Sequence, residues 1–294
     1  MSHLMDEIAS QPEIWSTAID LAAASSTAAA LPASGARVAV IGCGSSLNVA
    51  RCYARLREAA GHGETDAYPA SELTATRRYD HMVLISRTGT TSEVLAALQE
   101  IPQGVRTTSL TAGTSAPLAN ETSSVVLLDF ADERSVVSSR FITAAIVLLR
   151  AHLGEDLGGL PREAERALAS PLPPELAERK EFTFLGRGWA AFAADEAALK
   201  LREASQTWAE SYPAMEYRHG PISVSDSGTV TWGIGEIPDS LAADAARTGA
   251  TVINDGGDPL AGLIGAQRMA VMLAARKGID PDQPRSLSRS VILA

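Results

Sequence analysis

Residues 38–49 read VAVIGCGSSLNV and residues 182–193 read FTFLGRGWAAFA, and the two stretches have the same form. Each is a short β-rich run that reaches a Gly-x-Gly turn and continues as helical sequence. Gly186 follows Gly42 by 144 positions (186 − 42), and the second glycines of the two turns are the same distance apart. One repeated strand and turn is weak by itself, but two such halves predict two copies of one nucleotide-sized α/β unit.

Strand-like and helix-like stretches alternate along the first half. Buried-type strands are predicted at 37–42 and 81–86, and helices at 47–60 and 139–153. This order is typical of a parallel sheet with helices on both faces. Residues 154–175 contain Gly and Pro breaks around one short helix. We expect this segment to separate two domains.

The composition excludes several functional classes. A chain of 294 residues with 46% hydrophobic and 20% charged content predicts a globular protein of two ordinary domains. A formal charge of −10 argues against a nucleic-acid partner. The two cysteines, Cys43 and Cys52, are too few for a disulfide framework and lack metal-ligand spacing, so we expect no metal and a reducing cytoplasm.

A membrane partner is not expected either. The amino terminus is acidic and lacks the basic and apolar regions of a signal peptide. The longest apolar run, residues 141–149, is far below the roughly 20 residues that a membrane span needs.

Residues 83–94, VLISRTGTTSEV, concentrate hydroxyl groups around Gly89. The hydroxyls belong to Ser86, Thr88, Thr90, Thr91 and Ser92. A loop that leaves a strand and enters a helix offers backbone N–H groups and the positive end of the helix dipole, so phosphate is the expected ligand. Alternatively, Thr90 caps the helix and Glu93 closes a capping box.

A second loop, residues 42–46, offers the hydroxyls of Ser45 and Ser46 at the end of another predicted strand. In a parallel sheet both loops could hold one phosphate. A dinucleotide-binding turn is the alternative, and Asp66 does lie near the usual distance for a ribose contact. However, Leu47 stands where that motif needs its third glycine, and the sequence has no P-loop.

Residues 196–221 carry the charged groups of the second half. Glu196, Lys200 and Glu203 share one helical face at i, i+4 and i+7. A solvated salt-bridge stripe would have the same spacing. His219, between Arg218 and a Gly-Pro turn, is equally compatible with a structural histidine.

Taken together, the chain resembles the double sugar isomerase (SIS) domain family, and within it the isomerase half of the glucosamine-6-phosphate synthases, also called glutamine:fructose-6-phosphate amidotransferases. The order and spacing of the shared motifs are more specific than any single glycine loop, and they cover nearly the whole chain. The motifs are EIASQP (7–12), GCGSS (42–46), SRTGTTSE (86–93), ERSVVSSRF (133–141), FLGRG (184–188), ALKLREAS with AESYPAMEYRHGP (198–221) and DPDQPRSLSRSV (280–291).

The resemblance implies an α/β fold of two SIS domains, each a three-layer αβα sandwich around a mainly parallel, flavodoxin-like sheet. The first domain would span 1–155 and the second 179–294, with a linker at 156–178. The implied substrate is a sugar phosphate, with no cofactor. The implied substrate-binding residues are Gly44, Ser45, Ser46, Ser86, Arg87, Thr88, Gly89, Thr91, Val136, Ser138 and Arg289.

The resemblance also implies catalytic roles. Glu203 would move a proton between C1 and C2, His219 would assist ring opening, and Glu196 and Lys200 would complete the polar site. Lys200 would help to keep Glu203 ionised. In the family the histidine segment reaches the neighbouring subunit's pocket, so an obligate homodimer is implied.

Three departures from the family pattern shape the expected function. The chain begins without a glutaminase domain, so glutamine would supply no ammonia. Arg289 replaces the usual tail lysine and cannot form an imine, and Arg87 stands where Gln is common. The second domain is expected to be shortened, because residues 255–260, DGGDPL, pass almost directly into a helix.

These features favour breakdown of an amino-sugar 6-phosphate, by a deaminase and isomerase that releases ammonia and a ketose 6-phosphate. An aldose-ketose isomerase or a fructosamine-phosphate deglycase would use similar residues. A sugar-phosphate sensor without activity is the alternative of a different class. It would not need Glu203 together with His219.

Overall fold

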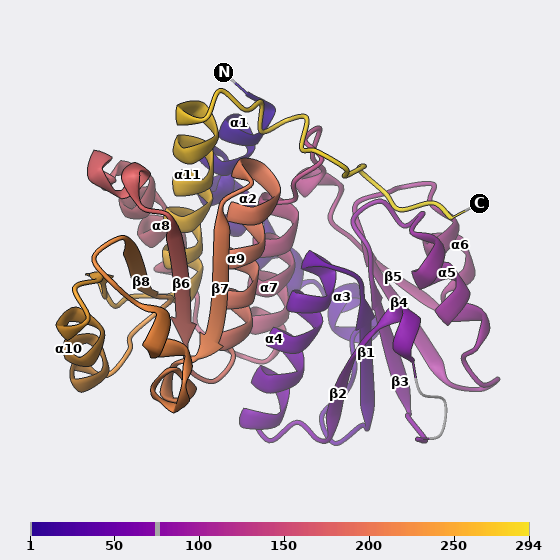
Figure 1. Ribbon diagram of the computed structural model, residues 1–294. Helices are drawn as coiled ribbons and strands as arrows, with labels where there is room; N and C mark the ends of the chain where they lie inside the picture. Colours follow the sequence, from indigo (N-terminus) through magenta and orange to yellow (C-terminus); the bar gives the residue numbers. More distant parts are fainter. Residues whose placement is uncertain (1, 74–76, 294) are drawn as a thin grey trace. The chain divides into compact units, whose positions relative to one another are not determined.

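The computed structural model describes residues 2–73 and 77–293, which form two compact units (Figure 1). We name each unit by its sheet. The five-stranded unit comprises residues 13–73, 77–134, 140–158 and 288–293, and the four-stranded unit comprises residues 2–12, 135–139 and 159–287.

This division differs from the expected boundaries at both ends of the chain. The first residues group with the four-stranded unit, and residues 288–293 group with the five-stranded unit. Most of the expected linker, from residue 159 onward, also belongs to the four-stranded unit, because α8 (Leu160–Ala169) packs against α11 (Pro259–Arg276).

All strands of the five-stranded sheet are parallel, in the order β2-β1-β3-β4-β5. The central strands β1 and β3 are completely buried, as their unbroken apolar sequences predicted. The strand β2 is half-exposed and too polar to stand out in the sequence. The strands are β1 (Val38–Gly42), β2 (Thr65–Pro69), β3 (His81–Ile85), β4 (Arg106–Thr111) and β5 (Ser124–Leu127).

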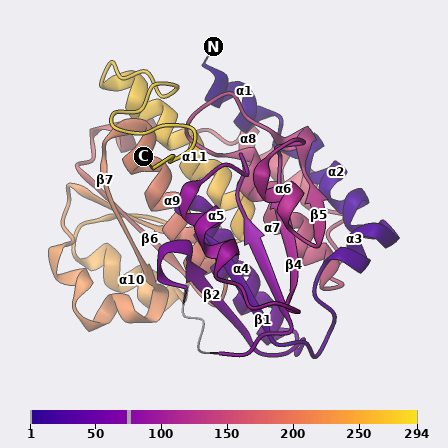
Figure 2. The same cartoon turned by 90° about the vertical axis from the view of Figure 1, so that its right-hand side faces the viewer.

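Helices cover both faces of this sheet (Figures 1 and 2). On one face α4 packs against α7, and on the other Val94 and Leu98 of α5 and Leu118 of α6 join the core beside β1 and β3. The indole of Trp15 in α2 donates to the Thr143 hydroxyl of α7 at 2.9 Å. The helices are α2 (Gln11–Ala23), α3 (Ser25–Ala30), α4 (Ser45–Ala59), α5 (Ser92–Gln99), α6 (Pro117–Glu121) and α7 (Arg140–His152).

The four-stranded sheet repeats this topology in the order β7-β6-β8-β9, again with parallel strands. Both orders follow the flavodoxin-like 2-1-3-4 pattern. After β9 the chain passes into α11 through residues 254–258, and the described part of this sheet has one strand fewer than its counterpart. The strands are β6 (Glu181–Gly186), β7 (Trp208–Pro213), β8 (Thr229–Gly233) and β9 (Thr251–Ile253).

The helix α9 (Ala190–Ser205) packs against α11, which also contacts α1 (His3–Ala9). The helix α10 (Asp239–Arg247) packs on the other face, where Leu241 joins a core with Leu185 and Tyr217. Within residues 2–73 and 77–293, no helix combines the length and apolarity needed to cross a membrane.

The repeated Gly-x-Gly turns have the same steric cause. A Cβ atom at Gly42 would lie 2.6 Å from the backbone carbon of Ser46, and one at Gly186 would lie 2.1 Å from the carbonyl oxygen of Ala190. The second glycine of each turn, Gly44 or Gly188, has a positive φ, 52° or 58°. Each helix therefore starts directly against the end of its strand.

We predict that Gly186→Ala destabilises the fold by about 1–3 kcal/mol, because the new methyl group overlaps the backbone of α9. Urea unfolding of the purified variant measures this loss. Gly159→Ala is the matched control, because its φ is −87° and a Cβ there meets no atom within 4 Å. Equal midpoints for the two variants would contradict the steric explanation.

Candidate functional site

The two hydroxyl-bearing turns of the five-stranded unit follow adjacent strands. The strand β1 pairs with β3 in parallel, so the turn at 42–46 and the loop at 86–91 both leave the carboxyl edge of the sheet. This is also where the strand order changes direction, since β2 and β3 flank β1 on opposite sides. Such switch points are where ligands of open α/β sheets bind.

Hydrogen bonds hold the hydroxyl loop, residues 86–91, in a fixed form. The Ser86 hydroxyl accepts from the Gly89 N–H at 3.1 Å and lies 3.2 Å from the Thr91 hydroxyl. Gly89 has a φ of 65°, and a Cβ there would lie 2.5 Å from Ala116. The N-cap of α5 is Thr91, whose side chain makes no capping bond, so the capping box based on Thr90 is wrong.

The carboxyl-terminal tail, residues 288–293, lies along the hydroxyl loop (Figure 1). The Ser290 hydroxyl lies 3.2 Å from that of Thr88 and 2.9 Å from that of Thr90. The Val291 carbonyl accepts from the Ser92 N–H at 3.1 Å. These contacts leave Ser86 and Thr91 as the loop hydroxyls that the tail does not bind.

Ser46 differs from the loop hydroxyls. It lies in the first turn of α4, whose N-cap Gly44 offers no side chain. The Ser46 hydroxyl is half-buried and makes no hydrogen bond to residues 2–73 or 77–293, whereas Ser45 does have a partner. Ser46 is therefore a donor available to a ligand beside the N-terminus of a helix.

Both arginines that the sequence assigned to the substrate are paired with carboxylates. Arg87 is buried, and its guanidinium lies 3.1 Å from buried Glu133. A second nitrogen of Arg87 donates to the carbonyl of Arg289 at 3.3 Å. The Arg289 guanidinium lies 2.5 Å from Asp132. Their substrate-binding roles remain predictions.

The alternative role for Asp66 finds no geometric support. The Asp66 carboxylate accepts from the Tyr79 hydroxyl at 2.6 Å and pairs with Arg77 at 2.7 Å. This carboxylate is therefore occupied by neighbouring side chains.

In the four-stranded unit, Glu196, Lys200 and Glu203 form a buried charge cluster on α9. The Lys200 ammonium lies 3.2 Å from the Glu196 carboxylate and also donates to Glu203. Side-chain exposure is 2% for Lys200, 1% for Glu196 and 20% for Glu203. The interpretation as a solvated stripe is therefore wrong.

The cluster fixes the protonation of its lysine. Burial disfavours the charged ammonium, but the carboxylates of Glu196 and Glu203 outweigh burial and raise the pKa of Lys200 above its usual value. Lys200 therefore stays protonated at neutral pH and is not a base. Glu203, the most exposed member, is the group that can meet a ligand.

Glu203 lines a pocket of about 410 Å³ at the carboxyl end of α9. The helix ends at Gln206, a non-glycine residue with a φ of 51°. Lys277 stabilises this end by donating to the Ser205 carbonyl at 3.0 Å and to the Thr207 hydroxyl at 2.6 Å. Burial lowers the pKa of Lys277. The pocket residues are Leu199, Arg202, Glu203, Gln206, Thr207, Trp208, Arg285 and Leu287.

The segment with the predicted sugar contacts belongs to the same unit as the cluster. Val136 and Ser138 are half-buried within residues 135–139. Glu7 of α1 holds this segment, because its carboxylate accepts from the Ser135 N–H at 3.3 Å and from the Ser135 hydroxyl. Sequence reasoning assigned no role to Glu7. The only sequence signal for Glu7 was its position in the EIASQP motif.

The structure does not bring His219 to Glu203 within one copy of the unit. Glu203 shares its pocket with Trp208, the first residue of β7, whereas His219 follows Pro213 at the other end of that strand. Six residues of strand separate these ends by roughly 17 Å. His219 is exposed and makes no hydrogen bond to any described residue, so it is not a structural histidine.

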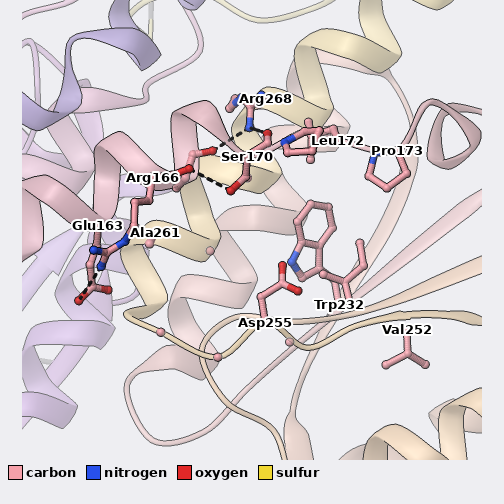
Figure 3. Close-up of a pocket in the computed structure, with 18 residues that line it drawn as sticks. Glu163, Arg166, Ser170, Leu172, Pro173, Trp232, Val252, Asp255, Ala261 and Arg268 are labelled. Carbon is pink, nitrogen blue, oxygen red and sulfur yellow. Dashed lines mark hydrogen bonds and ion pairs between the residues drawn. The ribbon is translucent and has the colours of Figure 1, made fainter.

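A second pocket of the four-stranded unit, about 400 Å³ beside β9, is less suited to an anion (Figure 3). Arg268 donates to the carbonyls of Ala167 and Ser170, each at 2.7 Å. The N–H groups that begin α11 are also taken, because Glu163 accepts from the Asp258 N–H and Asp258 accepts from the Leu260 N–H. The Arg268 guanidinium and these N–H groups are thus occupied by bonds within the unit.

We predict that Lys200→Met destabilises the protein by about 3–5 kcal/mol, because it leaves a carboxylate buried without its cation. Adding Glu196→Gln should recover part of this loss in urea unfolding. Lys180→Met, which breaks an exposed pair with Asp226, is the control and should leave the midpoint nearly unchanged. If Lys200→Met and Lys180→Met lower the unfolding midpoint equally, burial does not explain the effect of Lys200.

No family model matches the chain. Among curated relatives, the glutamine–fructose-6-phosphate aminotransferase (isomerizing) of Nostoc sp. is 34% identical over 194 residues, which are 56% of this chain and 30% of that protein. The enzyme of the same name from Sulfolobus acidocaldarius is 28% identical over 296 residues, 88% of this chain and 50% of that protein. The chain thus spans half or less of these relatives.

Solved structures match the chain almost end to end. The glucosamine-6-phosphate deaminase of Thermotoga maritima superposes with a TM-score of 0.82 at 24% identity, covering 99% of this chain and 100% of that one. The C-terminal domain of the Francisella tularensis glucosamine-fructose-6-phosphate aminotransferase gives 0.79 at 21% identity, covering 97% and 98%. Tagatose-6-phosphate ketose/aldose isomerase of Escherichia coli gives 0.76 at 19% identity, covering 96% and 95%. The chain is therefore similar in sequence to part of the glutamine–fructose-6-phosphate aminotransferases, as its motifs predicted, and it shares the fold of these solved structures.

Proposed function

We propose that this protein is a phosphosugar isomerase and deaminase, which converts a 2-amino-2-deoxyhexose 6-phosphate into a ketose 6-phosphate and ammonia. The observation that carries the proposal is the buried Glu196–Lys200–Glu203 cluster, which presents one carboxylate to a pocket. The names of the structural neighbours agree with it, since they include a deaminase and an isomerase of sugar phosphates.

The proposed chemistry follows from the acidity of a carbon beside a carbonyl. In the open-chain amino sugar, the aldehyde at C1 acidifies the proton at C2. Glu203 takes this proton while the C1 oxygen gains one, which gives a C1–C2 enaminol. Glu203 then returns its proton to C1 and the nitrogen loses a proton, which leaves a hydroxymethyl group at C1 and an imine at C2. Water adds to C2 and ammonia leaves. Lys200 keeps its charge beside Glu203, because the neighbouring carboxylates raise the pKa of Lys200 above its usual value.

We assign the phosphate to the five-stranded unit. The turn at 42–46 and the hydroxyl loop offer neutral donors at the carboxyl edge of a parallel sheet, next to the N-termini of α4 and α5. Hydrogen bonds to a charged phosphate are stronger than those between neutral groups. We likewise infer that the two units are two SIS domains and that the reaction takes place in the cytoplasm.

A homodimer is part of the proposal. His219 is exposed and lies at the opposite end of β7 from Glu203. A histidine that assists ring opening must therefore come to each Glu203 from a second copy. A plain aldose-ketose isomerase is the second candidate, because the same proton transfer serves a sugar without nitrogen and one structural neighbour is such an isomerase.

We predict that Glu203→Gln lowers kcat for ammonia release from glucosamine 6-phosphate by about 10²- to 10⁴-fold, because the amide cannot accept the proton. A coupled ammonia assay measures this. Glu165→Gln, on the exposed surface of α8, is the control. Unchanged turnover in Glu203→Gln would refute the proposed base. If the wild type releases no ammonia but interconverts aldose and ketose phosphates, the second candidate, a plain aldose-ketose isomerase, is favoured.

The phosphate assignment generates a separate prediction. Ser46→Ala should raise KM for the phosphorylated substrate about 10-fold without lowering stability, because the hydroxyl has no partner in the described structure and its loss affects only a ligand. Ser26→Ala, an exposed serine of α3, is the control. If Ser46→Ala shifts KM equally for an unphosphorylated sugar, Ser46 does not bind phosphate.

A further inference from the structure

The motif EIASQP (7–12) begins with a buried carboxylate that the proposed reaction does not use. Glu7 lies on α1 and is 4% exposed. Burial of a charged group is costly unless hydrogen bonds compensate it. One carboxylate oxygen of Glu7 accepts from the Ser135 N–H at 3.3 Å, and the other accepts from the Ser135 hydroxyl. Glu7 therefore binds residues 135–139 of its own unit through two hydrogen bonds in a buried place.

Ser135 shapes the segment 135–139, which carries the predicted sugar contacts Val136 and Ser138. Residues 132–139 form no helix or strand. The Ser135 hydroxyl also lies 2.8 Å from the Val137 carbonyl, and this contact closes a turn of the backbone around Val136. Because regular secondary structure does not fix this segment, its form depends on bonds between side chains and backbone.

The helix that carries Glu7 is itself held at both ends. It packs against α11 (Figure 1). At its start, Asp282 accepts from the His3 N–H at 2.6 Å and from the Leu4 N–H at 2.9 Å. After its end, the buried amide of Gln11 donates to the buried Gln267 side chain of α11 at 2.8 Å. Two motifs that the proposed chemistry does not use, EIASQP and the beginning of DPDQPRSLSRSV, thus fix one short helix.

We propose that Glu7 is a positioning residue of the proposed reaction, which fixes residues 135–139 through Ser135 in the form that presents Val136 and Ser138 to the sugar. This inference rests on the proposed function and adds to it a residue that does not touch the substrate. Displaced sugar contacts weaken binding of the substrate and of the transition state alike. The loss of Glu7 is therefore expected in KM rather than in kcat.

Substitution of Glu7 and of its partner measures this role. Glu7→Ala should raise KM for glucosamine 6-phosphate about 10-fold, because both bonds to Ser135 are lost. Ser135→Ala keeps the bond from its N–H and should raise KM about threefold. In both variants kcat should change less than about threefold. Asp6→Ala is the matched control, because it removes an exposed carboxylate from the same helix, and it should change neither constant.

Glu7→Gln distinguishes position from charge. The amide keeps one oxygen for the Ser135 N–H, and its NH2 group can donate to the Ser135 hydroxyl while that hydroxyl donates to Val137. The KM of Glu7→Gln should therefore stay within about threefold of the wild-type value. A KM as high as that of Glu7→Ala would mean that the negative charge acts, and the positioning role would be wrong.

Inhibition by inorganic phosphate distinguishes a local effect from a general loss of structure. Phosphate carries no sugar, and the residues to which we assign it lie in the five-stranded unit. Its Ki should be the same in the wild type and in Glu7→Ala. A Ki that rises together with KM would reduce Glu7 to a support of the fold. If Glu7→Ala does not fold, Ser135→Ala serves for the same comparison.

The outcomes separate this inference from the proposed function. If the wild type releases ammonia through Glu203 but Glu7→Ala and Ser135→Ala keep the wild-type KM, the positioning role alone is overturned. If the wild type acts on neither glucosamine 6-phosphate nor fructose 6-phosphate, the proposed function fails and the role of Glu7 fails with it.

Discussion

Among the glycines of the chain, the one with the least room for a side chain lies where a strand end meets the helix that follows it. At Gly186 a single added carbon would lie 2.1 Å from the Ala190 carbonyl, and Gly42 faces the start of α4 in the same way. Because no side chain intervenes, each helix begins directly at the carboxyl edge of its sheet. The positive end of the helix dipole and the first free N–H groups are thereby delivered to that edge, where ligands of parallel sheets bind.

The two units surround this shared geometry with different side chains. In the five-stranded unit, Ser46 and the hydroxyl loop place neutral donors beside two helix N-termini, and the arginines nearby are already paired with Glu133 and Asp132. In the four-stranded unit, the N-terminus of α11 is satisfied by Asp258 and Glu163. The charged cluster of this unit, Glu196, Lys200 and Glu203, lies instead in the carboxyl-terminal half of α9. The proposed phosphate site and the proposed base therefore lie in separate copies of one topology.

The α9 cluster brings three charged side chains together in one largely buried group. One cation and two carboxylates are withdrawn from water, and the Lys200 pKa rises because its neighbours outweigh the loss of solvation. Glu196 is fully buried with it, while Glu203 keeps 20% of its side chain exposed. Lys277 and the αL residue Gln206 hold the end of the helix next to Glu203. The Glu203 carboxylate therefore lies beside a helix end that is held by hydrogen bonds.

The sequence by itself determined the alternation of strands and helices, the 144-residue repeat and the identity of the cluster and loops, because these depend on local pattern and on spacing. It did not reveal β2, whose short polar strand is stabilised only by pairing with β1, or the role of Glu7, whose partner Ser135 is 128 residues away. Spacing could not decide whether Glu196, Lys200 and Glu203 were solvated, or whether Thr90 capped α5. Only the tertiary structure decided these points, because burial and hydrogen bonding depend on segments that are distant in the chain.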